Sequence, residues 1–385
     1  MKLSHLLIPF ALLTTSAQAQ ETAEDYQADA LQVIELIEEN YAYLDRFPDD
    51  EIPLNPALQE EAESVDSAAA LLRFTERMLF ALRDHHAITG SAFSDSWALV
   101  PSYADLWITF ADGEYVVDAV REGSPAERAG ILPGLRLTHI GEVPVDEAVQ
   151  AFWNDQGETA PDAMSREFAA RILSAGRRDR ARDLGFEGEA GAFSTTLPSM
   201  YDEQSSPREL VTAHYDSETL IVRFNDSLGN NATIAAFDAI MAEAGDAERI
   251  VLDLTDTPGG GNTTVARGIM GWFVDEISPY QIHEWVAEEL QTGIVRRWVE
   301  QVVPREGKHF PGDVSVRVGR WTGSMGEGLA IGMQAQGARL EGGPMAGLLG
   351  AIYDLRTDRT GFLFKLPAER LYTVNGTPRE DVPVP

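Results

Sequence analysis

The sequence predicts an α/β protein: a mixed sheet with packed helices forms the core, and a β-rich module and an N-terminal helical cap accompany it. Three patterns predict this order: helical periodicity within 20–95, short strand-like runs over 100–150, and alternating strands and helices over 211–385. A chain of 385 residues is also too long for one small core. We therefore expect several domains, with a connecting helical segment over 151–210.

The first residues have the composition of a secretory signal peptide. A basic start, Met1-Lys2, precedes an apolar run over 6–13 and an Ala-Gln-Ala site that ends at Ala19. An N-terminal membrane anchor is the alternative, but the run is much shorter than the roughly 18 residues of a span. We expect a signal peptide over 1–19 and a periplasmic or secreted protein without an integral membrane span.

The composition argues against several classes of function. The formal net charge of -32 would repel nucleic acid. The chain has no cysteine, which rules out disulfides, thiolate metal sites and a cysteine nucleophile. The histidines are scattered without an H-E-x-x-H pattern, and no phosphate loop or dinucleotide fingerprint occurs. We expect no metal and no cofactor.

The β-rich module contains a hairpin followed by a short helix. Strand-like runs over 106–110 and 115–120 are joined by Asp112-Gly113, which is a hairpin turn signal. In the segment 123–134, Ser124 can cap a helix that begins with proline.

Ser324 lies between a predicted strand over 314–318 and a predicted helix over 325–334. A serine at this position faces backbone N–H groups and the positive end of the helix dipole, both of which stabilise a developing oxyanion. Serine is also a common helix cap with no chemical role. The spacing alone leaves both interpretations open.

Three segments, taken together in their order and spacing, resemble the carboxyl-terminal-processing, or tail-specific, serine peptidase family. They are 123–134, 320–332, and 253–262 with its Pro-Gly-Gly-Gly turn. The resemblance is to the histidine-using branch related to the tricorn protease core, and it covers nearly all of the chain after the signal peptide. It implies a ClpP/crotonase-like peptidase core over 211–385 and a PDZ-like domain over 100–150.

The same resemblance implies roles for the residues of the site. Ser324 would be the nucleophile, and Glu327 matches the family's glutamate three residues further on. The N–H of Gly259 or Gly260, together with that of Met325, would form the oxyanion hole, where glycine allows close approach of the substrate.

The base departs from the family's more common pattern. Many members use a lysine about two dozen residues after the serine, where this chain has Gly-Leu-Leu-Gly at 347–350; Lys308 and Lys365 lie off that register. The histidine branch has an Asp-x-His pattern at the end of the cap, which His86 matches. We expect His86 to be the base, with His85 as the alternative, because histidine titrates near neutral pH.

A third group should orient the imidazole. The tricorn-like arrangement takes a glutamate from near the C-terminus, which corresponds to Glu380, with Glu327 and Asp381 as alternatives.

The PDZ-like domain would bind a peptide along a sheet edge beside Trp107 and hold its terminal carboxylate on backbone N–H groups. The preceding loop, 102–105, lacks the family's glycine, so a gating or scaffolding role stays open.

These inferences predict an exported serine endopeptidase of the C-terminal-processing type that acts on peptides or unfolded proteins through an acyl-enzyme. One alternative is a catalytically inactive peptide-binding scaffold of the same fold, and another is an acyl-CoA-handling enzyme of related sheet topology. Labelling by a fluorophosphonate would favour the peptidase, and coenzyme A binding would favour the acyl-CoA-handling enzyme. Assembly into homo-oligomers stays open.

Overall fold

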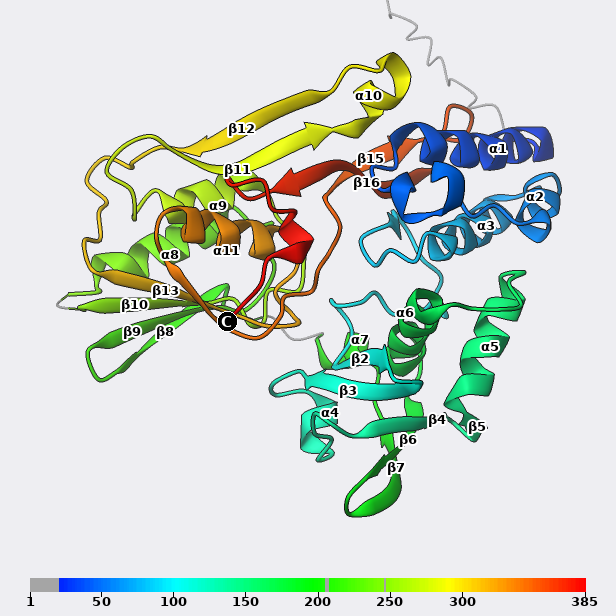
Figure 1. Ribbon diagram of the computed structural model, residues 1–385, viewed down its shortest axis with the longest axis horizontal. Coiled ribbons are helices and arrows are strands. Elements are labelled where there is room, and N and C mark those ends of the chain that lie inside the picture. The colour runs from blue at the N-terminus through cyan, green and yellow to red at the C-terminus, as the bar shows by residue number, and fades with distance from the viewer. Residues whose placement is uncertain (1–20, 205–207, 246) are drawn as a thin grey trace, which may run out of the picture.

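The computed structural model describes residues 21–204, 208–245 and 247–385. They form a helical part near the N-terminus, a middle domain and an α/β core (Figure 1). The predicted signal peptide over 1–19 lies outside the described residues. Within the described ranges, no helix has both the length and the apolar character that a membrane span requires.

The core begins with a five-stranded sheet in the order β14-β13-β10-β9-β8. Four of its strands are parallel: β9 (Thr219–Phe224), β10 (Arg249–Asp253), β13 (Asp313–Val318) and β14 (Arg339–Gly342). The edge strand β8 (Val211–Asp216) is antiparallel to β9. The intervening helices are α8 (Ala232–Ala242), α9 (Thr263–Met270) and α11 (Met325–Ala335). This alternation confirms the predicted mixed α/β class.

A second sheet, which the sequence analysis did not identify, covers the other side of these helices. Its strands are β1 (Ile88–Thr89), β11 (Ser278–Trp285), β12 (Arg296–Val302), β15 (Ala351–Arg356) and β16 (Leu363–Tyr372), and α10 (Val286–Thr292) joins β11 to β12. Figure 1 shows α9 and α11 between the two sheets. Leu252 of β10, Leu329 of α11 and Tyr280 of β11 belong to one apolar cluster, so a buried layer of helix separates two layers of sheet.

The N-terminal helices pack on the second sheet. They are α1 (Ala23–Asn40), α2 (Pro56–Ala62) and α3 (Ala68–Ala81), followed after α1 by two short 3-10 turns, Leu44–Arg46 and Pro48–Asp50. Val33 and Phe74 share an apolar cluster with Phe364 and Leu366 of β16. The chain after α3 then adds β1 to β16, which fixes the intervening turn against the core.

The middle domain is built on a sheet in the order β2-β3-β4-β6-β7, with β5 paired to β4. Its strands are β2 (Leu106–Ala111), β3 (Glu114–Val120), β4 (Arg136–Ile140), β5 (Val143–Pro144), β6 (Arg182–Gly188) and β7 (Gly191–Leu197), and its helices are α4 (Pro125–Arg128), α5 (Val145–Asp155), α6 (Ala163–Ala175) and α7 (Met200–Glu203). Asp112 and Gly113 have φ of 54° and 82°, which confirms the predicted hairpin turn.

The prediction of a connecting helical segment over 151–210 is wrong in its second half. That half contains β6 and β7, and β6 pairs directly with β4. Leu184 and Phe186 of β6 are buried in the same cluster as Val117 and Leu137. The middle domain therefore needs these strands to complete its core, and it extends well past residue 150.

Candidate active site

Ser324 lies at the first turn of α11 in an unusual backbone conformation. Its φ of 53° and ψ of -114° fall in a region that residues with a side chain rarely occupy. Three contacts hold the turn: Gly323 N–H donates to Thr257 O at 2.9 Å, Gly326 N–H donates to Gly323 O at 2.9 Å, and Ser324 N–H donates to Glu327 at 2.7 Å. The neighbouring residue must be glycine, because a Cβ on Gly323 would lie 2.7 Å from the Pro258 carbonyl oxygen.

Glu327 connects this turn to a second loop. One carboxylate oxygen accepts the N–H of Ser324, and the other accepts the N–H of Gly347 at 2.9 Å. Its side chain is fully buried, and burial raises the pKa of Glu327 to about 7 although Arg379 and both N–H groups favour the ionised form. The sequence suggested that Glu327 matches the family's glutamate or orients the imidazole. In the structure its carboxylate instead accepts two main-chain N–H groups.

His86 faces the Ser324 hydroxyl. Its Nε2 lies 3.0 Å from Ser324 Oγ, and its Nδ1 lies 2.7 Å from the carbonyl oxygen of Leu349. A carbonyl can only accept a hydrogen bond, so Nδ1 carries the proton in the neutral ring. Nε2 is then unprotonated and accepts the hydrogen bond of the serine hydroxyl, which is the arrangement that a general base needs.

The surroundings of His86 keep the ring neutral. Burial, with a smaller contribution from the positive charge of Arg379, lowers the pKa of His86 from its usual value near 6.5 to about 4; the hydrogen bond to Leu349 opposes this shift. The expectation of a base that needs no large shift is therefore wrong for this site.

Asp84 fixes the turn that presents His86. Its carboxylate accepts the His86 N–H at 2.8 Å and the Tyr41 hydroxyl at 2.9 Å. Burial raises the pKa of Asp84 to about 6, against the effect of Arg46. The Asp-x-His pattern thus has a structural reason: the aspartate holds the main chain of the histidine. His85, the alternative base, instead stacks on Phe168 with the ring centroids 4.5 Å apart.

Arg379 holds the loop that orients His86. Its guanidinium donates to the carbonyl oxygens of Leu348 at 2.6 Å, Gly350 at 2.8 Å and Ser324 at 3.3 Å, and its side chain is almost fully buried. These bonds bracket Leu349, whose carbonyl accepts from His86. Arg379 therefore sets the position of both the serine and the group that orients the base.

Glu380 is not the group that orients His86, which corrects the sequence expectation. The Nδ1 of His86 bonds to the Leu349 carbonyl, and Asp381 makes no side-chain contact with the imidazole either. Glu380 lies near enough for its charge to raise the pKa values of Asp84 and Glu327. The orienting group is a main-chain oxygen, which leaves no signature in the sequence. Arg379, the residue before Glu380, was the available clue, because it bonds to the loop that carries this oxygen.

The loop 258–261 lies against the start of α11. Thr257 and Thr322 form a parallel bridge, and a Cβ on Gly261 would fall 2.3 Å from that of Met325. Within the described ranges, neither Gly259 nor Gly260 donates its N–H to a protein acceptor. The N–H of Met325 is also free of an intrahelical partner, as at every helix start. The predicted oxyanion donors thus come from two adjoining loops.

Trp107 does not line a peptide groove, which corrects a second expectation. Its side chain is 1% exposed, and the guanidinium groups of Arg171 and Arg320 lie 4.4 and 5.2 Å from the ring centroid. It packs in one cluster with Trp321 and Leu348. Trp107 therefore joins the middle domain to the core, close to the turn of Ser324.

The outer edge of β2 is also occupied. Arg171 Nε donates to the Ile108 carbonyl at 2.8 Å, and Phe110 N–H donates to Glu167 at 2.9 Å. Both partners belong to α6. A peptide that adds to this edge must first displace them, so this conformation does not offer the predicted carboxylate-capture site.

The middle domain contacts the segments that precede the loop 258–261 and Ser324. Arg121 pairs with Asp256, just before the loop 258–261, at 2.6 Å. Arg320, four residues before the serine, pairs with Asp118 at 2.7 Å. The indole N–H of Trp321 donates to a middle-domain carbonyl at 2.8 Å. The geometry of the site therefore depends on the docking of this domain.

Neither of the two lysines in the described ranges bonds to the serine. Lys308 pairs with Asp238 and Lys365 pairs with Asp354, both elsewhere in the core. The described residues contain no group of three or more side chains suited to hold a metal ion.

No protein-family model matches the sequence, and no curated protein sequence matches it either. Solved structures do match. A photosystem II D1 C-terminal processing protease aligns at 16% identity with a TM-score of 0.55, over 92% of this chain and 90% of its own. Mature CPAF aligns at 12% identity with a TM-score of 0.59, over 94% and 91%. At these identities the likeness establishes a shared fold.

The backbone of Ser324 predicts the effect of glycine there. Ser324→Gly should be more stable to urea than Ser324→Ala by about 1 kcal/mol or more, because glycine tolerates a φ of 53° without the cost that a Cβ brings. The measurement is the urea midpoint of both variants, with Ser64→Gly and Ser64→Ala as an exposed reference pair. If Ser324→Gly is less stable than Ser324→Ala, the inference that the Ser324 backbone is strained is wrong.

Proposed function

We propose that this protein is a serine peptidase in which Ser324 attacks the scissile carbonyl and His86 accepts its proton. One observation carries the proposal: an imidazole nitrogen, left unprotonated by the Leu349 carbonyl, lies 3.0 Å from a serine hydroxyl at a helix N-terminus. A fold shared with a C-terminal processing protease supports it.

The first half of the reaction forms an acyl-enzyme. As Ser324 Oγ bonds to the substrate carbonyl carbon, its proton moves to His86 Nε2, and the carbonyl oxygen becomes an oxyanion. The N–H of Met325 and that of Gly259 or Gly260 would donate to this oxygen, and each such donor contributes a few kcal/mol to the barrier reduction. His86 then gives its proton to the leaving amine as the C–N bond breaks.

The second half regenerates the enzyme. Water attacks the Ser324 ester while His86 takes its proton, the new acid leaves, and the proton returns to Ser324 Oγ. The imidazolium formed in each half is disfavoured by burial and Arg379, at a cost of about 3 kcal/mol relative to a solvated histidine. An oxyanion held nearby offsets this cost, which couples proton transfer to formation of the tetrahedral intermediate.

The first test is covalent labelling with a fluorophosphonate, followed by peptide hydrolysis. Ser324→Ala should abolish labelling. Ser324→Ala, His86→Ala and the double variant should each lose about 1000-fold or more in kcat/KM, by similar factors, because the pair acts as a unit.

Ser64→Ala and His214→Ala change exposed residues outside the site and should behave as wild type. A folded wild-type protein that neither labels nor cleaves peptides would instead support the second candidate, a non-catalytic binding protein of the same fold.

The second test is the pH profile. The reactive form has neutral His86, so kcat/KM should stay high as the pH falls to about 5 and should then drop through an apparent pKa near 4. The unfolded chain binds this proton at a higher pH, so the contribution of His86 to folding stability declines as the pH falls from about 6.5 to about 4, whereas the raised pKa values of Asp84 and Glu327 act in the opposite direction.

The profile is measured from about pH 8 to about pH 3, with circular dichroism at each point to separate unfolding from titration. Asp84 and Glu327, with pKa values of about 6 and about 7, can also titrate in this range, so Asp84→Asn and Glu327→Gln are measured alongside. An acid limb near 6.5 that persists in both folded variants would mean that the base is solvated or is a different group.

We also infer export, on the evidence of the residues before Gln20. Mass spectrometry of protein from the cell envelope or medium should find Gln20 as the first residue, whereas Leu12→Arg should block processing by disrupting the apolar run. Cytoplasmic protein with an intact Met1 in the wild type would overturn this inference.

A further inference from the structure

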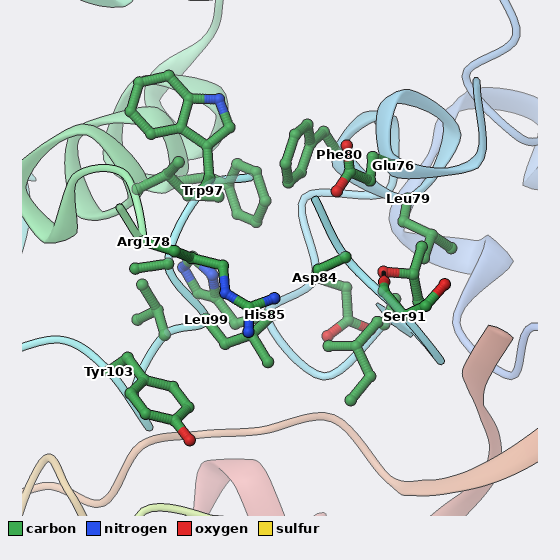
Figure 2. Close-up of a pocket in the computed structure, with 18 of the residues that line it drawn as sticks. Glu76, Leu79, Phe80, Asp84, His85, Ser91, Trp97, Leu99, Tyr103 and Arg178 are labelled. Atoms are coloured by element: carbon green, nitrogen blue, oxygen red, sulfur yellow. Dashed lines mark hydrogen bonds between the residues drawn. The ribbon is translucent and has the colours of Figure 1, made fainter. Parts of the chain in front are cut away.

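A cavity of about 350 Å³ lies between the N-terminal helices and the middle domain (Figure 2). Its walls come from α3, the chain over 84–103, α6 and α7. Most of its lining is apolar, and five aromatic side chains contribute: Phe80, Trp97, Tyr103, Phe168 and Tyr201. This volume is at the lower end of the range for ligand pockets.

The cavity borders the base on one side. Asp84, His85 and Ala87 line it, while the His86 ring between them points to Ser324. The turn that carries the base is therefore also a wall of the cavity.

The cavity borders the proposed oxyanion loop on the other side. Leu99, Val100 and Tyr103 line it, and the chain between them reaches that loop: Ser102 Oγ lies 3.7 Å from a Cβ built on Gly259. Val100 also belongs to the cluster of Trp321, three residues before the serine. Ser324 and His86 do not line the cavity themselves, but two of its walls are formed by segments that contact them or the loop 258–261.

The charged groups of the lining are largely engaged. Asp84 accepts from His86 and Tyr41, and Glu76 accepts from Ser96 and pairs with Arg73. Burial lowers the pKa of His85, so this ring adds no positive charge at neutral pH.

Arg178 places its guanidinium 4.3 Å from the centre of the Tyr201 ring. An apolar group can therefore enter without separating an ion pair, whereas a charged side chain would be desolvated against aromatic walls.

We infer that this cavity is the specificity pocket of the proposed peptidase and that it takes a large apolar side chain, such as phenylalanine or leucine, from a residue flanking the scissile bond. The inference rests on the proposed function for its substrate. A large side chain fills the space between the aromatic walls, whereas alanine leaves it unpacked. Differences of this kind change kcat/KM by about 10- to 200-fold.

The test starts from a host peptide whose cleavage site is identified by mass spectrometry. Each flanking position is then changed in turn to phenylalanine, leucine, alanine or aspartate. At one position, phenylalanine or leucine should exceed alanine by about tenfold or more in kcat/KM, and aspartate should be poorest.

Leu99→Trp should narrow the cavity, since Leu99 lines it and is 38% exposed, which leaves room for the change. This variant should lose most of the preference for phenylalanine, measured as the ratio of kcat/KM for the phenylalanine peptide to kcat/KM for the alanine peptide. Leu132→Trp is the matched control, because Leu132 is 63% exposed in the middle domain and does not line the cavity; it should keep the wild-type preference.

A binding measurement separates failure of the pocket from failure of the enzyme. The same peptides are titrated into Ser324→Ala, with and without Leu99→Trp, by calorimetry. If the wild type is labelled by the fluorophosphonate but cleaves or binds all four peptides equally, the pocket assignment is overturned and the peptidase stands.

If there is neither labelling nor cleavage, the peptidase fails and binding alone decides. Selective binding of the phenylalanine peptide that Leu99→Trp removes supports the pocket, and equal or absent binding overturns it.

Discussion

The buried carboxylate of Glu327 connects the two halves of the site. It accepts one N–H from the turn of Ser324 and one from Gly347, which begins the loop that carries the Leu349 carbonyl. Arg379 donates to main-chain oxygens of the same two segments and pairs with Glu327 at 3.7 Å. Because a glutamate without these partners would be costly to bury, the nucleophile turn and the orienting loop hold each other in place. The disfavoured backbone of Ser324 persists because its surroundings are fixed in this way.

The site is assembled from parts that fold around different cores. His86 comes from the turn after the N-terminal helices, Ser324 from the parallel sheet, and the middle domain contacts both loops through Arg121 and Arg320. The N-terminal helices share an apolar cluster with β16, and the middle domain meets the core through the cluster of Trp107 and Trp321 as well as through ion pairs. The position of the middle domain relative to the core rests on these ion pairs and on the packing of Trp107.

The sequence predicted the features that a local pattern or a family resemblance can indicate. The alternating strands and helices of the core, the hairpin at Asp112-Gly113 and the serine at a strand-to-helix turn all have local signatures. The second sheet was missed because β16, its central strand, pairs with β1 and β11, which lie far from it in the sequence and leave no local signature of that pairing. The orienting carbonyl of Leu349 was missed because any residue supplies the same atom. Trp107 was misplaced because an aromatic side chain suits a domain interface as well as a groove.

Ser324 and His86 are 238 positions apart in the chain, so they come together only when the chain folds. A serine hydroxyl without an aligned base is an ordinary alcohol. Here the His86 ring is held by the Leu349 carbonyl and, through the loop of that carbonyl, by Arg379, and both residues come after the serine in the chain. On the proposed function, a newly made molecule therefore has no assembled peptidase site while its own segments, and those of neighbouring copies, are still extended. The order of the residues along the chain would delay the proposed activity until these late segments have packed.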